Sequence, residues 1–184
     1  MKGSPELDAD LAYRARNGDL AADRTLVETY QEQVLRIGFR ISGDFHAAED
    51  IAQDSFLKAF RKLDTFDPNK GRFSSWLFRI TQNLALNARR KITPFPTPTK
   101  EGSGDLPSPS QATEQRDQMR QLDEVIQSLE EPFRTAFLLA EVEELPIAQI
   151  SEIENVPIGT IKSRISRAKA KLRESLTQSA PSTT

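Results

Sequence analysis

Residues 146–168 read PIAQISEIENVPIGTIKSRISRA, and this stretch decides the fold. Three isoleucines spaced three apart predict a short first helix. Asn155 then predicts a tight turn, because asparagine tolerates the left-handed backbone that such a turn needs. Pro157 and Gly159 mark the start of a second helix, which we expect over residues 159–176. Two helices joined by a tight turn are the layout of a helix-turn-helix.

The second helix of this motif has an apolar side and a basic side. At about 100° per residue, one narrow stripe collects Ile161, Ile165, Ala168 and Leu172, which we expect to be buried. Residues 155–176 hold six basic residues against one acidic residue. Hydroxyl groups and cations suit base edges and phosphates in a major groove, whereas the alternative is an ordinary solvated face. The predicted DNA contacts are Thr160, Lys162, Ser163, Arg164, Arg167 and Lys171.

Charge is distributed unevenly along a chain whose net charge is only −2. Residues 116–154 hold ten acidic residues against three basic ones, directly before the basic helix. We therefore expect only modest affinity for free DNA, because the acidic segment opposes binding. A second basic stretch, residues 68–100, holds seven basic residues and no acidic residue.

Helical periodicity runs through the rest of the chain and predicts an all-α fold. The first half contains four such stretches, Leu11–Ala22, Arg24–Ile41, Ala47–Leu63 and Ser74–Lys91. Five of the 11 prolines then fall between residues 92 and 112, which predicts a flexible linker. We expect two small helical domains, joined by the linker and followed by a disordered polar tail. The first domain is expected over residues 10–92 and the second over residues 117–176. The linker between them covers 93–116, and the tail covers 177–184.

Several classes of protein are excluded by what the sequence lacks. It has no apolar run long enough for a transmembrane helix, no secretory leader and no cysteine, so we expect a cytoplasmic protein. The single histidine, His46, is accompanied by no metal-ligand cluster, Gly-rich phosphate loop or nucleophile motif. We therefore predict a protein that is not an enzyme and holds no metal or cofactor.

Three motifs resemble the extracytoplasmic-function (ECF) sigma factors of bacterial RNA polymerase. Residues 156–168 are similar to the promoter-reading motif of sigma domain four. Residues 48–56, AEDIAQDSF, resemble the segment of domain two that docks on the polymerase clamp helices. Residues 73–85, FSSWLFRITQNLA, resemble the promoter-melting helix of domain two. The order and separation of the three motifs match a compact sigma factor.

The resemblance implies a role for specific residues of domain two. The polymerase-binding residues would be Asp50, Gln53, Asp54 and Phe56, although Phe56 also suits the core. The downstream promoter element would be held as a single strand by Lys70, Arg72, Phe73, Trp76, Arg79, Asn83, Asn87, Arg89 and Arg90. Phe73 and Trp76 could stack on bases or pack in the core. Asn87 stands where many relatives have aspartate, so the downstream preference can differ.

The function implied by the resemblance is that of a dissociable specificity subunit. It would direct RNA polymerase to promoters, with the core enzyme, promoter DNA and an anti-sigma factor as partners. The upstream element would be read by the helix-turn-helix. The alternative is a helix-turn-helix regulator whose N-terminal half senses a partner or signal, and residues 47–91 discriminate the two, because only a sigma factor needs them to bind polymerase and melt DNA.

Overall fold

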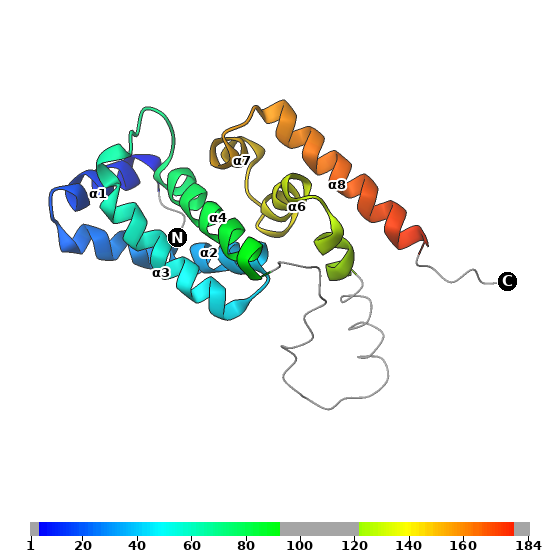
Figure 1. Ribbon diagram of the computed structural model, residues 1–184. Coiled ribbons are helices and arrows are strands. Elements are labelled where there is room, and N and C mark those ends of the chain that lie inside the picture. The colour runs from blue at the N-terminus through cyan, green and yellow to red at the C-terminus, as the bar shows by residue number, and fades with distance from the viewer. Residues whose placement is uncertain (1–3, 93–121, 179–184) are drawn as a thin grey trace, which may run out of the picture.

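The computed structural model describes residues 4–92 and 122–178, and all regular elements in these ranges are helical (Figure 1). The first half contains α1 (Pro5–Arg16), α2 (Leu20–Ser42), α3 (Phe45–Arg61), the 3-10 helix η1 (Leu63–Thr65) and α4 (Phe73–Ile92). The second half contains a helical stretch at 122–128, α6 (Glu131–Phe137), the π-helix η2 (Leu138–Val142), α7 (Ile147–Glu154) and α8 (Ile158–Gln178). The predicted all-α fold is confirmed.

Two sequence predictions reach beyond the described residues. The predicted linker, 93–116, lies wholly outside them, as does most of the predicted tail, 177–184. Helix α8 continues through Gln178, two residues past the predicted end of its domain. Within residues 4–92 and 122–178, no helix combines the length and the apolar character needed to span a membrane.

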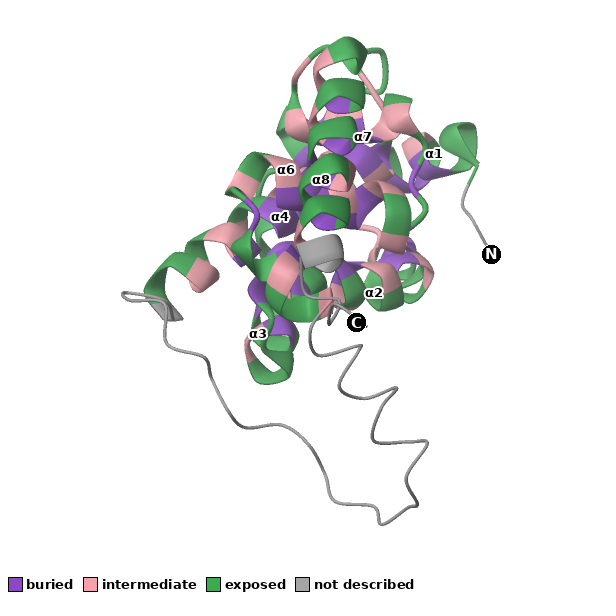
Figure 2. Cartoon of the chain, turned by 90° about the vertical axis from the view of Figure 1, so that its right-hand side faces the viewer, coloured by how far each residue is buried: buried purple, intermediate pink, exposed green. Residues whose placement is uncertain are grey.

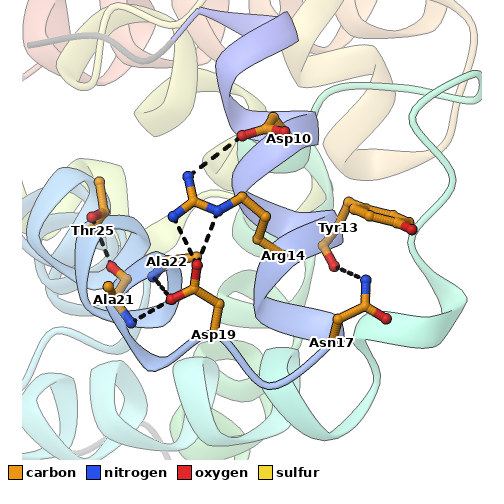
Figure 3. Close-up of polar contacts among 8 residues, drawn as sticks. All are labelled: Asp10, Tyr13, Arg14, Asn17, Asp19, Ala21, Ala22 and Thr25. Atoms are coloured by element: carbon orange, nitrogen blue, oxygen red, sulfur yellow. Dashed lines mark hydrogen bonds and ion pairs between the residues drawn. The ribbon is translucent and has the colours of Figure 1, made fainter.

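The predicted helix Leu11–Ala22 is wrong, because the chain turns sharply in its middle (Figure 3). Gly18 takes a φ of 89°, a left-handed conformation that glycine adopts without strain. Asp19 then caps α2, accepting hydrogen bonds from the amides of Ala21 at 2.9 Å and Ala22 at 3.3 Å. Arg14 holds the capping carboxylate from the preceding helix, at 2.7 Å.

The first half is a bundle in which α2, α3 and α4 pack on one another and α1 packs on α2. Its largest fully buried side chains are Leu26, Val34, Ile37, Ile41, Phe73, Leu77, Phe78 and Thr81. Tyr30 lies in this core and donates a hydrogen bond to the buried carboxylate of Asp8. Burial raises the pKa of Asp8, and the hydrogen bond from Tyr30 opposes that rise. Asp8 therefore depends on Tyr30 for its solvation inside the core.

The second half closes around α8, against which α6 packs. A compact apolar cluster joins Ala168 and Leu172 of α8 to Ile126 and Leu129, before α6, and to Leu138, after it. Arg134 is buried beside this cluster and donates to the carbonyls of Leu129 at 2.9 Å and Gln127 at 3.3 Å. Burial lowers the pKa of Arg134 to about 10. Arg134 thus satisfies the carbonyl end of the helical stretch at 122–128.

The two halves pack on each other through α4 and α7 (Figure 1). One continuous apolar cluster contains core residues of the first bundle together with Leu139, Leu145, Ile150, Ile153 and Ile161. At its margin the amide of Glu143 bonds to the carbonyl of Leu138 at 3.0 Å, which is the five-residue step of a π-helix. The Glu143 carboxylate then meets Arg36 of α2 at 3.1 Å and Arg40 at 3.8 Å.

The buried Asp8–Tyr30 pair gives a test of the first bundle. Tyr30→Phe should lower the free energy of unfolding by about 1–3 kcal/mol at neutral pH, because it leaves the Asp8 carboxylate without its donor. Urea unfolding followed by circular dichroism measures the change. Tyr13→Phe is the matched control, since Tyr13 is exposed, and should change stability by less than about 0.5 kcal/mol. Equal effects of the two changes would contradict this account of Asp8.

Candidate nucleic-acid interface

Helix α8 has the two sides that its sequence predicts. Ile161, Ile165, Ala168 and Leu172 are buried, which confirms the predicted stripe. Along the helix, buried residues recur about once per turn among exposed ones (Figure 2). Of the predicted DNA contacts, four are exposed and two are partly buried. The exposed ones are Lys162, Ser163, Arg167 and Lys171, and the partly buried ones are Thr160 and Arg164.

The turn before α8 is fixed by backbone geometry and one side chain. Asn155 takes a φ of 55° at the end of α7, the left-handed conformation expected from its residue type. Ser151 donates its hydroxyl to the carbonyl of Val156 at 2.6 Å, and the amide of Val156 bonds back to the Ser151 carbonyl at 3.2 Å. Val156 packs partly buried against the apolar cluster. These contacts fix the direction in which α8 leaves α7.

Arg164 forms an ion pair that the sequence analysis missed. Its guanidinium pairs with Glu154 at the end of α7, whose side chain is only 5% exposed while that of Arg164 is 23% exposed. Burial raises the pKa of Glu154, and the charge of Arg164 opposes that rise. One Glu154 oxygen is buried without a hydrogen-bond partner among the described residues. The ion pair therefore fixes the end of α7 against α8, and Arg164 stabilises the angle between the two helices.

Acidic residues already engage part of the basic face of α8. Lys171 pairs with Glu130 at 2.9 Å and Lys169 with Glu141 at 2.7 Å. Arg167 and Lys171 both lie over the ring of Phe133, at 6.0 Å and 5.4 Å from its centre. All of these acidic partners come from the segment that carries the excess negative charge. The acidic segment therefore neutralises part of the positive charge of α8.

Helix α4 carries a second line of candidate DNA contacts. Taking about 100° per residue, five of its residues point within about 40° of the direction of Asn83. We call these residues the α4 stripe: Trp76, Arg79, Asn83, Asn87 and Arg90. The two amides are exposed, whereas both arginines bind groups of the second half. Lys70 and Arg72, in the loop before the helix, are exposed, and Lys70 lies 3.4 Å from Asp67.

Three predicted contacts of α4, Phe73, Trp76 and Arg89, are wholly or partly engaged in packing. Phe73 is 1% exposed and contacts the rings of Phe66 and Tyr30, so no base can reach it in this conformation. Trp76 is half-buried, with its ring 5.6 Å from that of Phe66. Arg89 is half-buried and donates to the carbonyl of Ile41 at 3.4 Å. Desolvation lowers its pKa.

A separate acidic face lies on α3. Asp50, Gln53 and Asp54 are exposed, whereas Phe56 is buried and stacks on Phe60, which is the core alternative weighed for it. Leu57 lies on the same exposed side with 53% of its surface accessible. We call Asp50, Gln53, Asp54 and Leu57 the docking face. The signal for Leu57 is present in the sequence, because this leucine falls outside the buried stripe of its helix.

Two further features of the described residues are His46 and a hollow beside α8. His46 is exposed and lies 3.5 Å from Glu49. Among the described residues, no group of three or more histidine, cysteine or acidic side chains is arranged to hold a metal ion. A shallow hollow of about 440 Å³ lies beside α8, lined by Leu145, Ile147 and Ile165 and by the basic Lys162, Lys169 and Arg173.

Comparison with known proteins adds two family matches. The Sigma-70 region 2 model matches residues 26–93, and the Sigma-70 region 4 model matches residues 119–172. The first match contains the α4 stripe and the docking face, and the second contains α7 and most of α8.

Relatives of similar length resemble the whole chain. The ECF RNA polymerase sigma factor SigW of Bacillus subtilis is 33% identical, over 89% of this chain and 93% of that protein. The RNA polymerase sigma-H factor of Pseudomonas aeruginosa is 34% identical, over 93% of this chain and 94% of that protein. Among solved structures, that of CnrH in complex with the cytosolic domain of CnrY is similar in fold, with a TM-score of 0.71 and 22% identity, covering 94% of this chain and 99% of that one.

The Glu154–Arg164 pair distinguishes a structural arginine of α8 from the exposed Arg167. Arg164→Ala should lower the free energy of unfolding by about 3 kcal/mol, because it leaves the buried Glu154 unpaired. Arg167→Ala, a change of an exposed side chain on the same helix, should cost less than about 1 kcal/mol. Chemical denaturation measures both changes. If Arg164→Ala proved as mild as Arg167→Ala, the bracing role would be wrong, whereas added Glu154→Gln should recover part of the loss.

Proposed function

Because this chain belongs to the ECF RNA polymerase sigma factors, we propose that its two halves bind the two elements of a promoter. The chain is a sigma factor, a dissociable specificity subunit that directs RNA polymerase to promoters and starts transcription. The observation that carries the proposal is the presence of three separate faces on one chain. They are the acidic docking face on α3, the α4 stripe, and the basic face of α8.

In our proposal the docking face binds the polymerase core. Its two aspartates stand one helical turn apart, so both can meet one basic partner surface. Leu57 follows them on the same side of the helix, about one turn past Asp54, and supplies apolar contact area. Phe56 supports this face from below, because its ring is in the core.

The α4 stripe captures the downstream element as a single strand. Unpairing DNA costs a few kcal/mol per step, which base capture and backbone contacts must offset. The exposed amides of Asn83 and Asn87 can bond to base edges, while the half-buried Trp76 offers an aromatic ring for stacking. Lys70, Arg72, Arg79, Arg89 and Arg90 supply positive charge for phosphates. Phe73 serves this site by packing beneath it rather than by touching a base.

The upstream element binds α8 in the major groove. Thr160, Lys162, Ser163 and Arg167 provide the hydroxyls and cations for base edges and phosphates. Lys171 contributes once a phosphate replaces Glu130, whose side chain is itself exposed and easily displaced. Arg164 acts by holding α8 at its angle to α7.

The chain acts by binding and deforming DNA, without a catalytic step of its own. We place its action in the cytoplasm, where the polymerase works, and assign it no cofactor. An anti-sigma factor is a further proposed partner. CnrH is seen with the cytosolic domain of CnrY, and RpoE of Bartonella quintana with the anti-sigma factor NepR, at a TM-score of 0.59 and 24% identity.

Run-off transcription tests the function directly. Core polymerase supplied with this chain should start transcripts from some members of a random promoter library, and core polymerase alone should start none. Sequencing the active templates would give both promoter elements. A failure to initiate on any template would overturn the sigma assignment and favour the regulator alternative.

Charge reversal tests the docking face. Asp54→Arg should weaken binding to core polymerase at least about tenfold, because it sets a like charge against a basic partner. Asp64→Arg is the control, as Asp64 is an equally charged and exposed residue outside the docking face. Fluorescence titration of labelled chain with core polymerase gives both affinities. Equal weakening by the two changes would place the polymerase contact elsewhere.

A further inference from the structure

Phe133 of α6 lies beside two of the proposed DNA contacts of α8. Its half-buried side chain packs against the apolar cluster that joins the second half of the chain. The guanidinium carbon of Arg167 lies over the ring, 6.0 Å from its centre, and the ammonium nitrogen of Lys171 lies 5.4 Å from it. Both distances fall within the range in which an aromatic ring attracts a cation. Phe133 therefore connects the apolar cluster to the basic face of α8.

Arg167 has no carboxylate partner within residues 4–92 and 122–178, unlike three other basic residues of its helix. Those three each pair with a glutamate, in the pairs Arg164–Glu154, Lys169–Glu141 and Lys171–Glu130. For Arg167, the contact recorded in the same ranges is the one with the Phe133 ring. Lys171 is attracted by the ring as well, but it also bonds to a carboxylate at 2.9 Å. The ring is therefore the group that determines where Arg167 lies.

An aromatic ring and a carboxylate affect a guanidinium differently. A carboxylate accepts its N–H groups and cancels its charge, so that a DNA phosphate has to displace the carboxylate first. A ring attracts the cation through the negative charge of its face, and it adds no net charge. The five N–H donors of the guanidinium stay available to oxygen acceptors. A ring can therefore orient an arginine without competing for the group that the arginine is to bind.

The position of Arg167 on α8 suits it for a DNA contact. At about 100° per residue, its direction falls within about 40° of those of Thr160 and Ser163, the two hydroxyl-bearing predicted contacts. Its side chain is exposed. A shallow hollow of about 450 Å³ lies beside the ring, lined by Glu130, Phe133, Arg167, Ala170, Lys171 and Glu174. Arg167 is thus open to a group that approaches the outer side of α8.

Holding an arginine in place before DNA arrives has an energetic consequence. A free arginine on a helix surface samples many rotamers, and it loses that freedom when it binds. A side chain that is already oriented loses less on binding, so its affinity for the same partner is higher. The ring of Phe133 is itself held by the apolar cluster and can therefore restrict Arg167.

We propose that Phe133 is a positioning residue, whose ring orients Arg167 for the upstream promoter element while leaving the guanidinium its charge and its donors. This role rests on the proposed binding of the upstream element by α8. It adds a residue of α6, outside the helix-turn-helix, to those that determine the affinity of α8 for DNA. The ring acts through Arg167, and Lys171 is held chiefly by Glu130.

Fluorination of the Phe133 ring tests this role at nearly constant shape. Fluorine atoms withdraw electron density from the face of the ring and so weaken its attraction for a cation, while its apolar packing changes little. The full-length chain receives a ring with one or three fluorine atoms at residue 133 by stop-codon suppression. Fluorescence anisotropy measures binding to a labelled random-sequence duplex of about three helical turns. Three fluorine atoms should weaken binding about threefold, and one should weaken it less.

Phe137 is the matched control, one helical turn later on α6. It is half-buried against the same apolar cluster, and no cation is recorded over its ring among the described residues. Three fluorine atoms at residue 137 should leave the affinity unchanged. Arg167→Ala should make binding insensitive to fluorination of Phe133, whereas Lys171→Ala should leave that sensitivity in place. An unchanged affinity after fluorination of Phe133, equal effects at residues 133 and 137, or sensitivity that survives Arg167→Ala would overturn the proposal.

A measurement without DNA follows the orientation of Arg167 directly. Nitrogen-15 relaxation of its Nε–H group should show a less ordered side chain in Phe133→Leu, which keeps an apolar side chain in the cluster, than in the parent. Equal order in the two proteins would overturn the positioning role. Neither measurement contains polymerase, so the sigma function is judged separately by run-off transcription. A chain that starts no transcripts can still show the dependence on fluorine, and a chain that starts them can lack it.

Discussion

Helix α4 has to pack on two sides at once, and the rest of the structure depends on how it does so. One side fills the core of the first bundle through Phe73, Leu77 and Phe78. An adjoining side carries arginines and asparagines that belong at a surface. The second half of the chain lies against that polar side and satisfies its arginines with carbonyl and carboxylate oxygens. The hydrogen-bond donors of α4 are thus satisfied by oxygen acceptors of the second half of the chain.

Basic side chains of α8 are likewise paired with oxygen acceptors from the second half of the chain. Glutamates of the acidic segment pair with Lys169 and Lys171, and Glu154 braces Arg164. The exposed pairs are worth little in free energy, so a phosphate can replace the carboxylate without great cost. The buried Glu154–Arg164 pair differs, because breaking it would strand a charge away from water. In our proposal, the acidic segment therefore lowers the affinity of α8 for non-specific DNA, and a promoter phosphate can displace its exposed carboxylates.

Much of the fold was predictable from local patterns. The helix-turn-helix, the left-handed Asn155 and the buried stripe of α8 all follow from residue type and a period of 3.6. The corner at Gly18 was missed because apolar residues keep helical spacing across it, so periodicity alone did not expose the break. Instead, the side chain of Asp19, held by Arg14, caps a new helix and so ends the first one.

The candidate site was harder to predict, because its residues have several possible partners. An exposed arginine is equally suited to a phosphate, a carboxylate or a helix end, and the sequence does not say which is nearby. Arg79 and Arg164 show this, since each binds a group far from it along the chain or across a turn. Aromatic residues are ambiguous in the same way, because a ring can pack in the core or stack on a base. Phe73 is fully buried in the core, whereas Trp76 is half-buried at its edge. Tertiary packing made these choices.

The single extra residue in the π-helix η2 has a consequence for how such chains diversify. It rotates everything after it by about 100° relative to an α-helix, and this rotation aims Glu143 at α2. Loss of one residue from η2 would turn that carboxylate aside while the apolar core on either side kept its composition. The coupling between the two halves is thus sensitive to length rather than to residue type. A deletion or insertion at η2 is therefore expected to weaken the contact between the halves even where every contacting residue is kept.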